Sequence, residues 1–163
     1  MALHFRRGTA ADVPVLIPMV VAQYALHAAW DAAKFAPRPD FEKGYARWLA
    51  ARATDPRSVL FVAEVETDAP APAVLAGFIV ATTETEIPVY LTRDYGFLHE
   101  LFVQPDYRNE GAARQLVTLT VEAFRDLGVT QVRCEAAWLN GPARGLFQRC
   151  GFREVAITLI HGA

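Results

Sequence analysis

The sequence has almost no lysine. Lysine occurs only at Lys34 and Lys43, so arginine supplies fourteen of the sixteen basic residues. A P-loop places a lysine directly after its glycine-rich turn, and no lysine follows residue 43. The dinucleotide fingerprint Gly-x-Gly-x-x-Gly is missing as well. Two common ways of binding a nucleotide phosphate are therefore excluded.

Cysteine is also scarce. Cys134 and Cys150 could pair, but no signal peptide with a basic region and an apolar core precedes the first periodic segment. We therefore expect a cytoplasmic protein in which both are reduced, small core residues. The two cysteines lack a third or fourth partner, and His4, His27 and His161 have no ligand spacing. We expect no metal site.

Neither an excess of positive charge nor a long hydrophobic run is present. Sixteen basic and eighteen acidic residues give a net charge of -2, which argues against a general nucleic-acid binder. The most apolar run, residues 13–22, contains Pro14 and Pro18 and is far shorter than the roughly 20 residues that cross a bilayer. We expect a soluble protein with no membrane association. The 163 residues, 53% of them hydrophobic, fit a single domain spanning 1–163.

Strand and helix patterns alternate along the chain. Thr9 is a candidate N-cap for a helix that continues to about residue 28, and residues 66–73 carry loop signals. Residues 84–96 have no clear pattern. The periodicity predicts strands over 3–7, 58–64, 73–83, 97–103, 131–137 and 152–160, and further helices over 41–53, 111–127 and 140–150. Such an order implies a sheet covered by helices, in an α/β or α+β domain.

The strongest chemical signal follows the predicted strand 97–103. A short turn containing Gly111 leads from this strand directly into the longest helix of the second half. The first N–H groups of a helix have no partner within it, and the helix dipole places positive potential there. The turn is therefore a candidate pyrophosphate site.

The letters around this turn match a known signature. The turn reads Arg108-x-x-Gly111-x-Ala113, and Val103-x-Pro105-x-Tyr107 stands directly before it. Further matching positions are Asn140, Ala143, Phe147, Gly151 and Phe152, together with the opening Phe5-Arg-Arg-Gly-Thr-Ala-Ala-Asp12. Together these motifs resemble those of the GCN5-related N-acetyltransferase (GNAT) superfamily across nearly the whole chain.

The resemblance implies a fold and a reaction. The fold would be α+β with three layers, in which a mixed, mostly antiparallel sheet of about six to seven strands is flanked by about four helices. The reaction would be direct transfer of an acetyl group from acetyl-CoA to an amine. Backbone groups of Leu101, Phe102 and Val103 would pair with the pantetheine arm, and an N–H near Val103 would polarise the thioester carbonyl. The pyrophosphate would be held by residues of the turn, namely Asn109, Glu110, Gly111, Ala112 and Ala113.

A narrower likeness is to the spermidine/spermine and related diamine acetyltransferases. It rests on the polar pair His99-Glu100 before Leu101-Phe102-Val103 and on Asn140-Gly-Pro142 at the start of the last helix. Homodimers are common in the superfamily, and the apolar segment 152–160 is compatible with one.

Two residues depart from the superfamily pattern. Asn109 stands where glycine is common, although asparagine is the other residue that best tolerates left-handed backbone angles. Phe147 stands where the superfamily usually has a tyrosine thought to protonate the leaving thiolate. Phenylalanine cannot donate that proton. A non-catalytic acyl-CoA-binding module is therefore the alternative to an enzyme.

The general base is left open between His99, Glu100 and water. Strand alternation predicts that His99 shares a face with Leu101 and Val103, whereas Glu100 points with Leu98 and Phe102 to the other face. In several superfamily members a base occupies the position of His99, and histidine has a suitable pKa without any shift. Glu100 could instead orient His99.

Other side chains have two interpretations each. Arg108 either contacts phosphate or stacks on Tyr107, and Asn140 either caps the last helix or also reaches the cofactor. Glu84 and Glu86 could bind a cationic acceptor or simply be solvated. The aromatic residues Tyr24, Trp30 and Trp48 have core spacing, and one of them could line the acceptor pocket.

Overall fold

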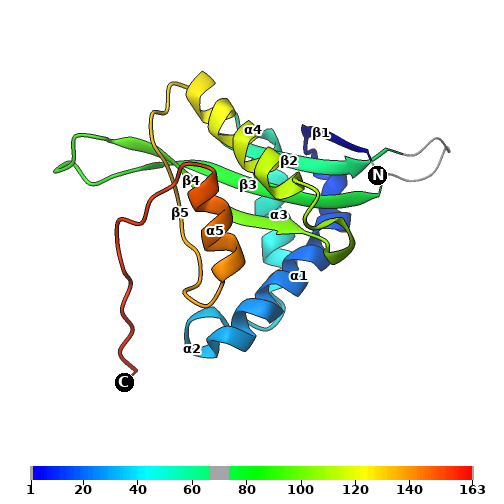
Figure 1. Ribbon diagram of the computed structural model, residues 1–163, viewed down its shortest axis with the longest axis horizontal. Helices are drawn as coiled ribbons and strands as arrows, with labels where there is room; N and C mark the ends of the chain where they lie inside the picture. The colour runs from blue at the N-terminus through cyan, green and yellow to red at the C-terminus, as the bar shows by residue number, and fades with distance from the viewer. Residues whose placement is uncertain (1, 67–73, 163) are drawn as a thin grey trace.

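A single sheet organises the molecule (Figure 1). The computed structural model describes residues 2–66 and 74–162, which include nearly none of the predicted loop at 66–73. The five strands lie in the order in which they occur in the chain: β1 (Leu3–Arg7), β2 (Ser58–Val65), β3 (Leu75–Thr85), β4 (Asp94–Val103) and β5 (Val132–Cys134). Neighbours are antiparallel except β4 and β5, which are parallel because helix α4 connects them.

Helices cover both faces of the sheet (Figure 1). A 3₁₀ turn (Ala10–Asp12) leads into α1 (Val13–Trp30), which lies with α2 (Ala32–Phe35) and α3 (Phe41–Thr54) on one side. The helices α4 (Ala112–Asp126) and α5 (Gly141–Arg149) lie on the other side, and the short 3₁₀ turn Pro105–Tyr107 precedes α4. Each face has its own apolar core, one under α1 and α3 and one under α4 and α5. The predicted three-layer α+β architecture is confirmed.

The number of strands was overestimated. The described residues contain five strands rather than six to seven, and residues 152–160, predicted as a strand, form none. Alternating apolar residues form a strand only beside a partner, and no strand within 2–66 and 74–162 pairs with this segment. In the unassigned region 84–96, residues 84–85 end β3 and residues 94–96 begin β4, with Thr85 paired to Asp94, and residues 86–93 form the connection between the two strands.

The apolar helix α1 runs through both prolines. Pro14 lies in its first turn, where a missing N–H costs nothing, and Pro18 lies within the helix. By length and mean hydropathy alone, residues 10–30 would suffice to span a membrane, contrary to the shorter run expected from the sequence. In this structure 28% of that window is buried, and Leu16, Met19 and Val20 are among the residues that pack against the sheet.

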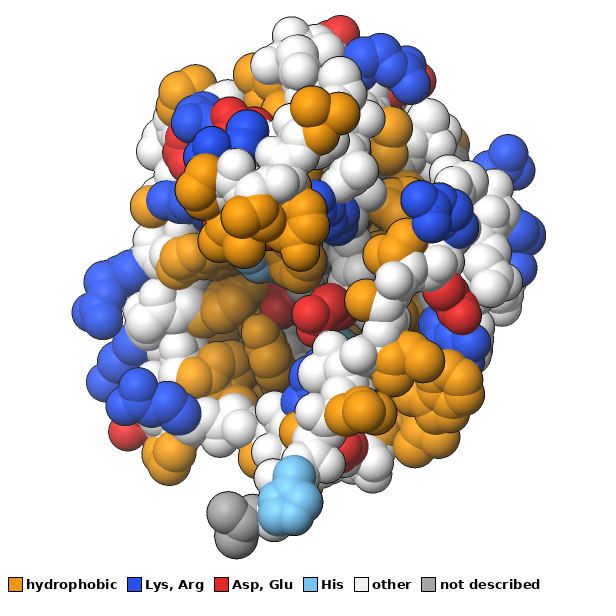
Figure 2. All heavy atoms as spheres, turned by 90° about the vertical axis from the view of Figure 1, so that its left-hand side faces the viewer, with side chains coloured by type: hydrophobic (Ala, Val, Ile, Leu, Met, Phe, Trp, Pro, Cys, Tyr) orange, Lys and Arg blue, Asp and Glu red, His pale blue; other side chains and the backbone are white. Residues whose placement is uncertain are grey.

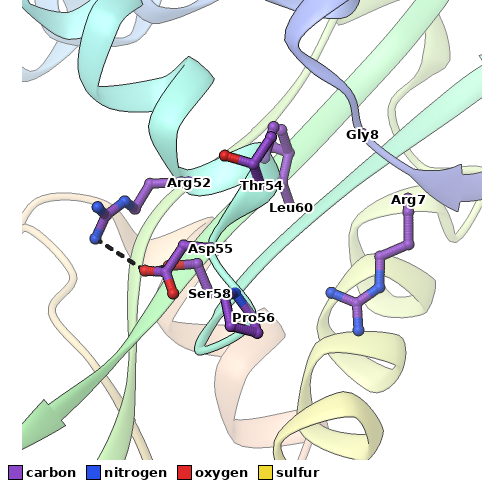
Figure 3. Close-up of a pocket in the computed structure, with 9 residues that line it drawn as sticks. Arg7, Gly8, Arg52, Thr54, Asp55, Pro56, Ser58 and Leu60 are labelled. Carbon is purple, nitrogen blue, oxygen red and sulfur yellow. Dashed lines mark hydrogen bonds and ion pairs between the residues drawn. The ribbon is translucent and has the colours of Figure 1, made fainter.

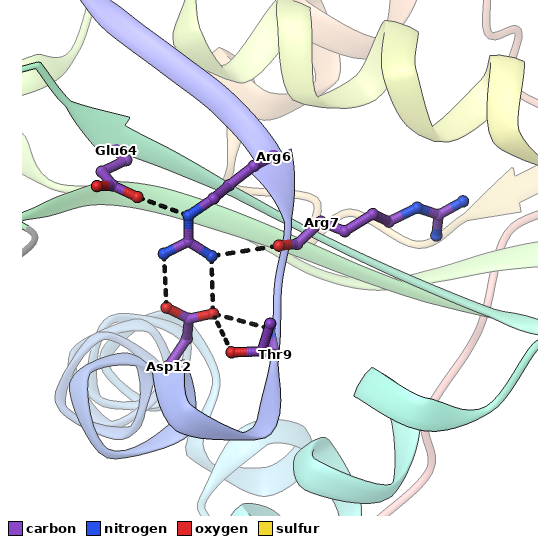
Figure 4. Close-up of polar contacts among 5 residues, drawn as sticks. All are labelled: Arg6, Arg7, Thr9, Asp12 and Glu64. Atoms are coloured by element: carbon purple, nitrogen blue, oxygen red, sulfur yellow. Dashed lines mark hydrogen bonds and ion pairs between the residues drawn. The ribbon is translucent and has the colours of Figure 1, made fainter.

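A partly buried ion pair joins β1 to the start of α1 (Figure 4). Two nitrogens of the Arg6 guanidinium donate to the two carboxylate oxygens of Asp12, at 2.8 and 2.9 Å. Asp12 Oδ2 also accepts from the backbone N–H and the hydroxyl of Thr9, which confirms that the first helical turn begins after Thr9. Glu64 on β2 accepts from Arg6 Nε at 2.6 Å. Hydrogen bonding to Arg6 lowers the pKa of Asp12 to about 2.

Replacing Asp12 is expected to destabilise the fold. Asp12→Ala leaves Arg6 partly buried beside an unpaired Thr9, so we expect a loss of about 2–4 kcal/mol in the free energy of unfolding. Because its folded pKa is depressed, Asp12 stabilises above its ordinary pKa and loses this effect as the pH falls toward about 2. Urea unfolding measured at neutral and acid pH tests both statements. Glu64→Ala, at the more exposed end of the pair, is the control and is expected to cost about 1 kcal/mol or less. Equal losses of unfolding free energy in Asp12→Ala and Glu64→Ala would show that Asp12 is not the more important partner of Arg6.

Candidate functional site

The parallel strands β4 and β5 pair over only three residues and then separate. Gly96, Phe97 and Leu98 of β4 are paired with β5, and the register ends at Leu98 opposite Cys134. In the described part of the chain, residues 99–103 of β4 have no strand on that side. The predicted residues Leu101, Phe102 and Val103 therefore lie along an edge whose backbone can pair with an extended ligand.

A β-bulge places His99 and Glu100 on the same face of the sheet. The pairing with β3 passes from Val80 opposite Glu100 to Ala81 opposite Leu98, so His99 is the inserted residue. Leu98 packs in the core under α4, whereas Glu100 contacts α1 and the His99 ring contacts Trp48 of α3. The predicted alternation holds for Glu100 with Phe102 but is wrong for His99 and Leu98, because it assumed a strand without an inserted residue.

Glu100 is a buried carboxylate, and within the described residues its oxygens accept from neutral donors rather than from a cation. Only 7% of it is exposed, and its two oxygens accept from Gln23 Nε2 and the Tyr24 hydroxyl, both at 2.6 Å. Burial raises its pKa to about 7, and the hydrogen bond from Tyr24 offsets part of that effect. Glu100 therefore exchanges a proton near neutral pH, as a general base must.

His99 has a different environment. Its Nε2 lies 2.6 Å from the Thr82 hydroxyl and 3.8 Å from Glu84, and its ring meets the rings of Trp48 and Phe97 edge-on. Burial lowers its pKa below the ordinary 6.5, a shift that Glu84 opposes. At neutral pH His99 is therefore mostly uncharged and held by a hydroxyl.

The turn before α4 has the geometry of an anion site. Asn109 has a φ of 67° and Gly111 a φ of 86°, so both occupy the left-handed region, as the sequence predicted for Asn109. Gly111 is the N-cap of α4, and Ala112 and Ala113 form its first turn. Gly96 on β4 brings this helix close, because a Cβ there would lie 2.5 Å from the Phe124 ring. Glu110 completes the turn.

Arg108 supports the turn. Its Nε donates to the backbone oxygen of Val103 at 2.9 Å, and its guanidinium lies over the ring of Phe102 at 5.7 Å. The sequence analysis offered stacking of Arg108 on Tyr107 as an alternative to phosphate contact, but the ring beneath the guanidinium is that of Phe102. Arg108 thus ties the end of β4 to the turn that follows.

A cleft opens where β4 and β5 separate. It brings together the predicted residues His99, Glu100, Leu101, Asn140 and Phe147, and is also lined by Gln23, His27, Leu98, Ala143 and residues 134–137. Figure 2 shows a hollow on the corresponding side of the molecule, with apolar walls and acidic side chains inside. Asn140 Oδ1 accepts from the Ala143 N–H at 3.1 Å, which confirms that Asn140 caps α5. Phe147 is buried at the cleft and contacts Phe152.

The comparisons with known proteins agree with this geometry. A model of the acetyltransferase (GNAT) family matches residues 24–152, most of the chain. The chain belongs to the GNAT acetyltransferase family. No curated protein matches it in sequence at a significant level.

Solved structures share the GNAT fold over almost the full length. An acetyltransferase from Clostridium acetobutylicum, described as predicted and solved with acetyl-CoA, is 15% identical with a TM-score of 0.74 and covers 99% of this chain and 96% of its own. Glucosamine-6-phosphate N-acetyltransferase from Arabidopsis thaliana is 13% identical with a TM-score of 0.71, covering 99% of both chains. An aminoglycoside 6'-N-acetyltransferase from Acinetobacter baumannii is 20% identical with a TM-score of 0.67, covering 99% and 98%. Identities this low establish the fold alone.

A larger pocket of this GNAT chain lies elsewhere (Figure 3). It has a volume of about 260 Å³ and is lined by residues of β1, the end of α3 and the start of β2, including Arg7, Arg52 and Asp55. Arg52 is directed toward Asp55, and Arg7 lies apart from both (Figure 3). None of the predicted site residues lines it, so we place the site at the smaller cleft between β4 and β5.

Two residues that line the cleft from α1, Gln23 and His27, were not predicted as site residues. Tyr24, one of the three aromatic residues considered for the acceptor pocket, donates a hydrogen bond to Glu100. The sequence does contain one indication of this side of the cleft, because Gln23 is a polar residue on the buried face of an apolar helix. Within the described residues no group of three metal-ligating side chains occurs.

Proposed function

We propose that this protein transfers an acetyl group from acetyl-CoA to a primary amine of a cationic small molecule or peptide. The observation that carries the proposal is the buried carboxylate of Glu100 in a cleft that also exposes the free edge of β4. The family supports acetyl transfer in general. The amine class and the residue roles below are proposals that rest on the site.

Acetyl-CoA binding uses main-chain groups in this proposal. The pantetheine arm pairs with the edge at Leu101–Val103 like a short added strand. The pyrophosphate lies at the N-terminus of α4, where N–H groups of residues 109–113 meet the positive end of the helix dipole. Arg108 holds the turn in place and adds positive charge nearby. The neutral to acidic overall charge is no obstacle, because dipolar N–H groups supply the attraction.

Glu100 is the proposed general base. A primary amine whose conjugate acid has a pKa near 10 is protonated in solution at neutral pH, so one proton must leave before the nitrogen can attack. Glu100 takes this proton, the amine nitrogen bonds to the acetyl carbon, and a main-chain N–H near Val103 stabilises the oxyanion. The C–S bond then breaks, coenzyme A leaves as thiolate, and the thiolate takes the remaining extra proton from the nitrogen of the resulting amide, directly or through water. His99, the second candidate, is turned toward Thr82 and has a lowered pKa.

The surroundings of Glu100 suit a cationic acceptor. An aromatic wall formed by Tyr24, Tyr45, Trp48 and His99 runs from Glu100 toward Glu84, each ring in contact with the next. His99 lines the cleft, and the other three rings pack behind it against the core under α1 and α3. Aromatic faces attract ammonium groups, and a carboxylate stands at each end of this wall. Glu86, by contrast, is paired with Arg133. Gln23 Oε1 is buried without a hydrogen-bond partner among the described residues and can accept from an amine. A diamine or polyamine meets these requirements.

Phe147 is expected to limit the turnover. A thiolate whose conjugate acid has a pKa of about 8.5 leaves without help at neutral pH, so an acid is useful without being essential. Phe147→Tyr places a hydroxyl at the cleft, and we expect kcat to rise by up to about ten-fold. Steady-state kinetics measure it, with Phe152→Tyr as the control that leaves kcat unchanged. An unchanged kcat in Phe147→Tyr, with intact acetyl-CoA binding, would show that Phe147 is not near the leaving sulfur.

The proposal is tested by following thiol release from acetyl-CoA. The purified protein is incubated with diamines, polyamines, aminoglycosides, amino acids and peptides, and binding of acetyl-CoA is measured separately by calorimetry. We expect release with cationic primary amines, and mass spectrometry should find the acetyl group on nitrogen. Binding without release for any amine would favour the non-catalytic acyl-CoA-binding module instead. Failure to bind would contradict both functions.

A further inference from the structure

One of the two lysines of this chain lies beside the cleft. Lys34 belongs to α2, and its Nζ is 3.4 Å from Oε2 of Glu135, a residue that lines the cleft directly after β5. The other lysine, Lys43, is exposed on α3. A lysine side chain is a primary amine on a short carbon chain, which is the chemical class of acceptor proposed above. Lys34 therefore places the chain's own primary amine next to the site.

Helix α2 connects the two walls of the cleft. On the α1 side, the ring of Phe35 packs against that of His27, with 5.3 Å between the ring centroids. His27 lines the cleft. On the other side Lys34 is paired with Glu135. Figure 1 shows α2 beyond the end of α1, beside the loop that leads from β5 to α5. The ammonium group of Lys34 is therefore at the outer end of the cleft.

The backbone of Lys34 is fixed, whereas its side chain is able to turn. Asp31 Oδ1 accepts from the N–H groups of Ala33 and Lys34, at 3.0 and 3.3 Å, and thereby caps α2. The side chains of Lys34 and Glu135 are 33% and 66% exposed, and an ion pair so exposed is weak. The flexible stem of four carbons can therefore carry the ammonium group from Glu135 into the cleft, toward Glu100.

We propose that this protein acetylates its own Lys34. The proposal rests on the proposed function, because it uses the same bound acetyl-CoA and the same base. Glu100 takes one proton from the Lys34 ammonium group, Nζ bonds to the acetyl carbon, and the C–S bond breaks. Coenzyme A leaves as thiolate and takes the second extra proton from Nζ. Lys34 becomes a neutral amide.

Acetylation removes the charge that joins α2 to Glu135. The carboxylate of Glu135 then no longer has the positive charge of Lys34 beside it and can attract a cationic acceptor. Lys34→Gln, neutral like the acetylated side chain, is expected to have a KM for a cationic amine about two- to five-fold lower than that of Lys34→Arg, which keeps the charge. Equal KM values in the two variants would contradict this role of the modification.

Mass spectrometry of the protein after incubation with acetyl-CoA alone tests the self-acetylation. We expect an acetyl group on Lys34, added at least about ten-fold faster than on Lys43, because Lys34 is tethered beside the cleft. Lys43 measures the uncatalysed background at an exposed lysine. Glu100→Gln should slow the labelling of Lys34 by about 10²- to 10⁴-fold and leave that of Lys43 unchanged. The fraction labelled per unit time should not depend on protein concentration.

Several results would overturn the proposal. Equal labelling of Lys34 and Lys43 would show a background reaction, and a rate that rises with protein concentration would show transfer between molecules. Labelling of Lys34 that persists in Glu100→Gln, while turnover of added amines falls, would show that the acetyl group does not arrive through the site. Thiol release with added amines but no acetyl group on Lys34 would overturn self-acetylation alone. Failure to bind acetyl-CoA would contradict the proposed function as well.

Discussion

Glu100→Gln is expected to lower kcat by about 10²- to 10⁴-fold, the usual contribution of a general base, without weakening the binding of acetyl-CoA. The amide preserves the size of the side chain and can still be held by Gln23 and Tyr24, but it cannot accept the proton of the amine. Steady-state kinetics with the best amine, and calorimetry with acetyl-CoA, separate the two effects. Glu135→Gln, at an exposed carboxylate lining the same cleft, is the matched control and is expected to keep most of the activity.

The pH profile identifies which group is the base. If Glu100 is the base, kcat/KM rises with pH through a value near 7, the raised pKa of this carboxyl group. If His99 is the base, the corresponding value lies below 6.5, because burial lowers the pKa of that ring. His99→Ala should preserve the profile near 7. Loss of that profile in His99→Ala, together with normal activity of Glu100→Gln, would contradict the assignment.

Glu100→Gln should also change how the free energy of unfolding depends on pH. The folded state holds the Glu100 proton more tightly than the unfolded state, because burial raises the pKa. The free energy of unfolding that this group contributes is therefore highest at low pH and falls as the pH rises toward about 7. Glu100→Gln should lack this fall. The buried carboxylate thus serves chemistry at some cost to stability, as is common for active-site groups.

Gly111→Asp is expected to weaken acetyl-CoA binding by at least about 100-fold, which corresponds to about 2.8 kcal/mol. Two causes act together. The carboxylate would stand at the N-terminus of α4, where we place the pyrophosphate, and would repel it. The φ of 86° is also unfavourable for any residue with a Cβ, so the turn would be strained. Calorimetry with acetyl-CoA measures the loss.

Gly128→Asp is the control for Gly111→Asp. Gly128 has a φ of 77°, lies just after the other end of α4 and has open space where a Cβ would be placed. It therefore reproduces the backbone strain and the added charge at a distance from the proposed phosphate site. We expect Gly128→Asp to lower stability and retain acetyl-CoA binding. Comparable loss of binding in both variants would show that the turn before α4 does not hold the pyrophosphate.

Local patterns predicted the elements that carry their own signal. Gly111 followed by an amphipathic stretch gave the start of α4, and Asn109 in the left-handed region followed from its side chain. The sequence also predicted that Asn140 caps the last helix, as its hydrogen bond with the Ala143 N–H shows. Each of these features depends on a few neighbouring residues, which is why a single sequence suffices to find them.

Features that depend on distant partners were not predictable. The bulge at His99 exists because β3 and β4 differ by one residue in their pairing, which no alternation within β4 alone reveals. The raised pKa of Glu100 depends on burial under α1, more than seventy residues earlier in the chain. In segment 152–160 the local strand pattern is clear, but within the described residues no strand pairs with it, so the predicted strand does not form.

The separation of β4 and β5 has a thermodynamic consequence. Three residue pairs join β5 to the rest of the sheet, so β5 and α5 are held by few backbone bonds. A ligand that pairs with the free edge of β4 and also contacts the β5 side of the cleft takes the place of the hydrogen bonds that the two strands do not make with each other. It thereby links β5 to the rest of the sheet. Ligand binding and the folding of β5 and α5, residues 132–149, are then one coupled equilibrium, and part of the intrinsic affinity for the ligand is used to close the sheet.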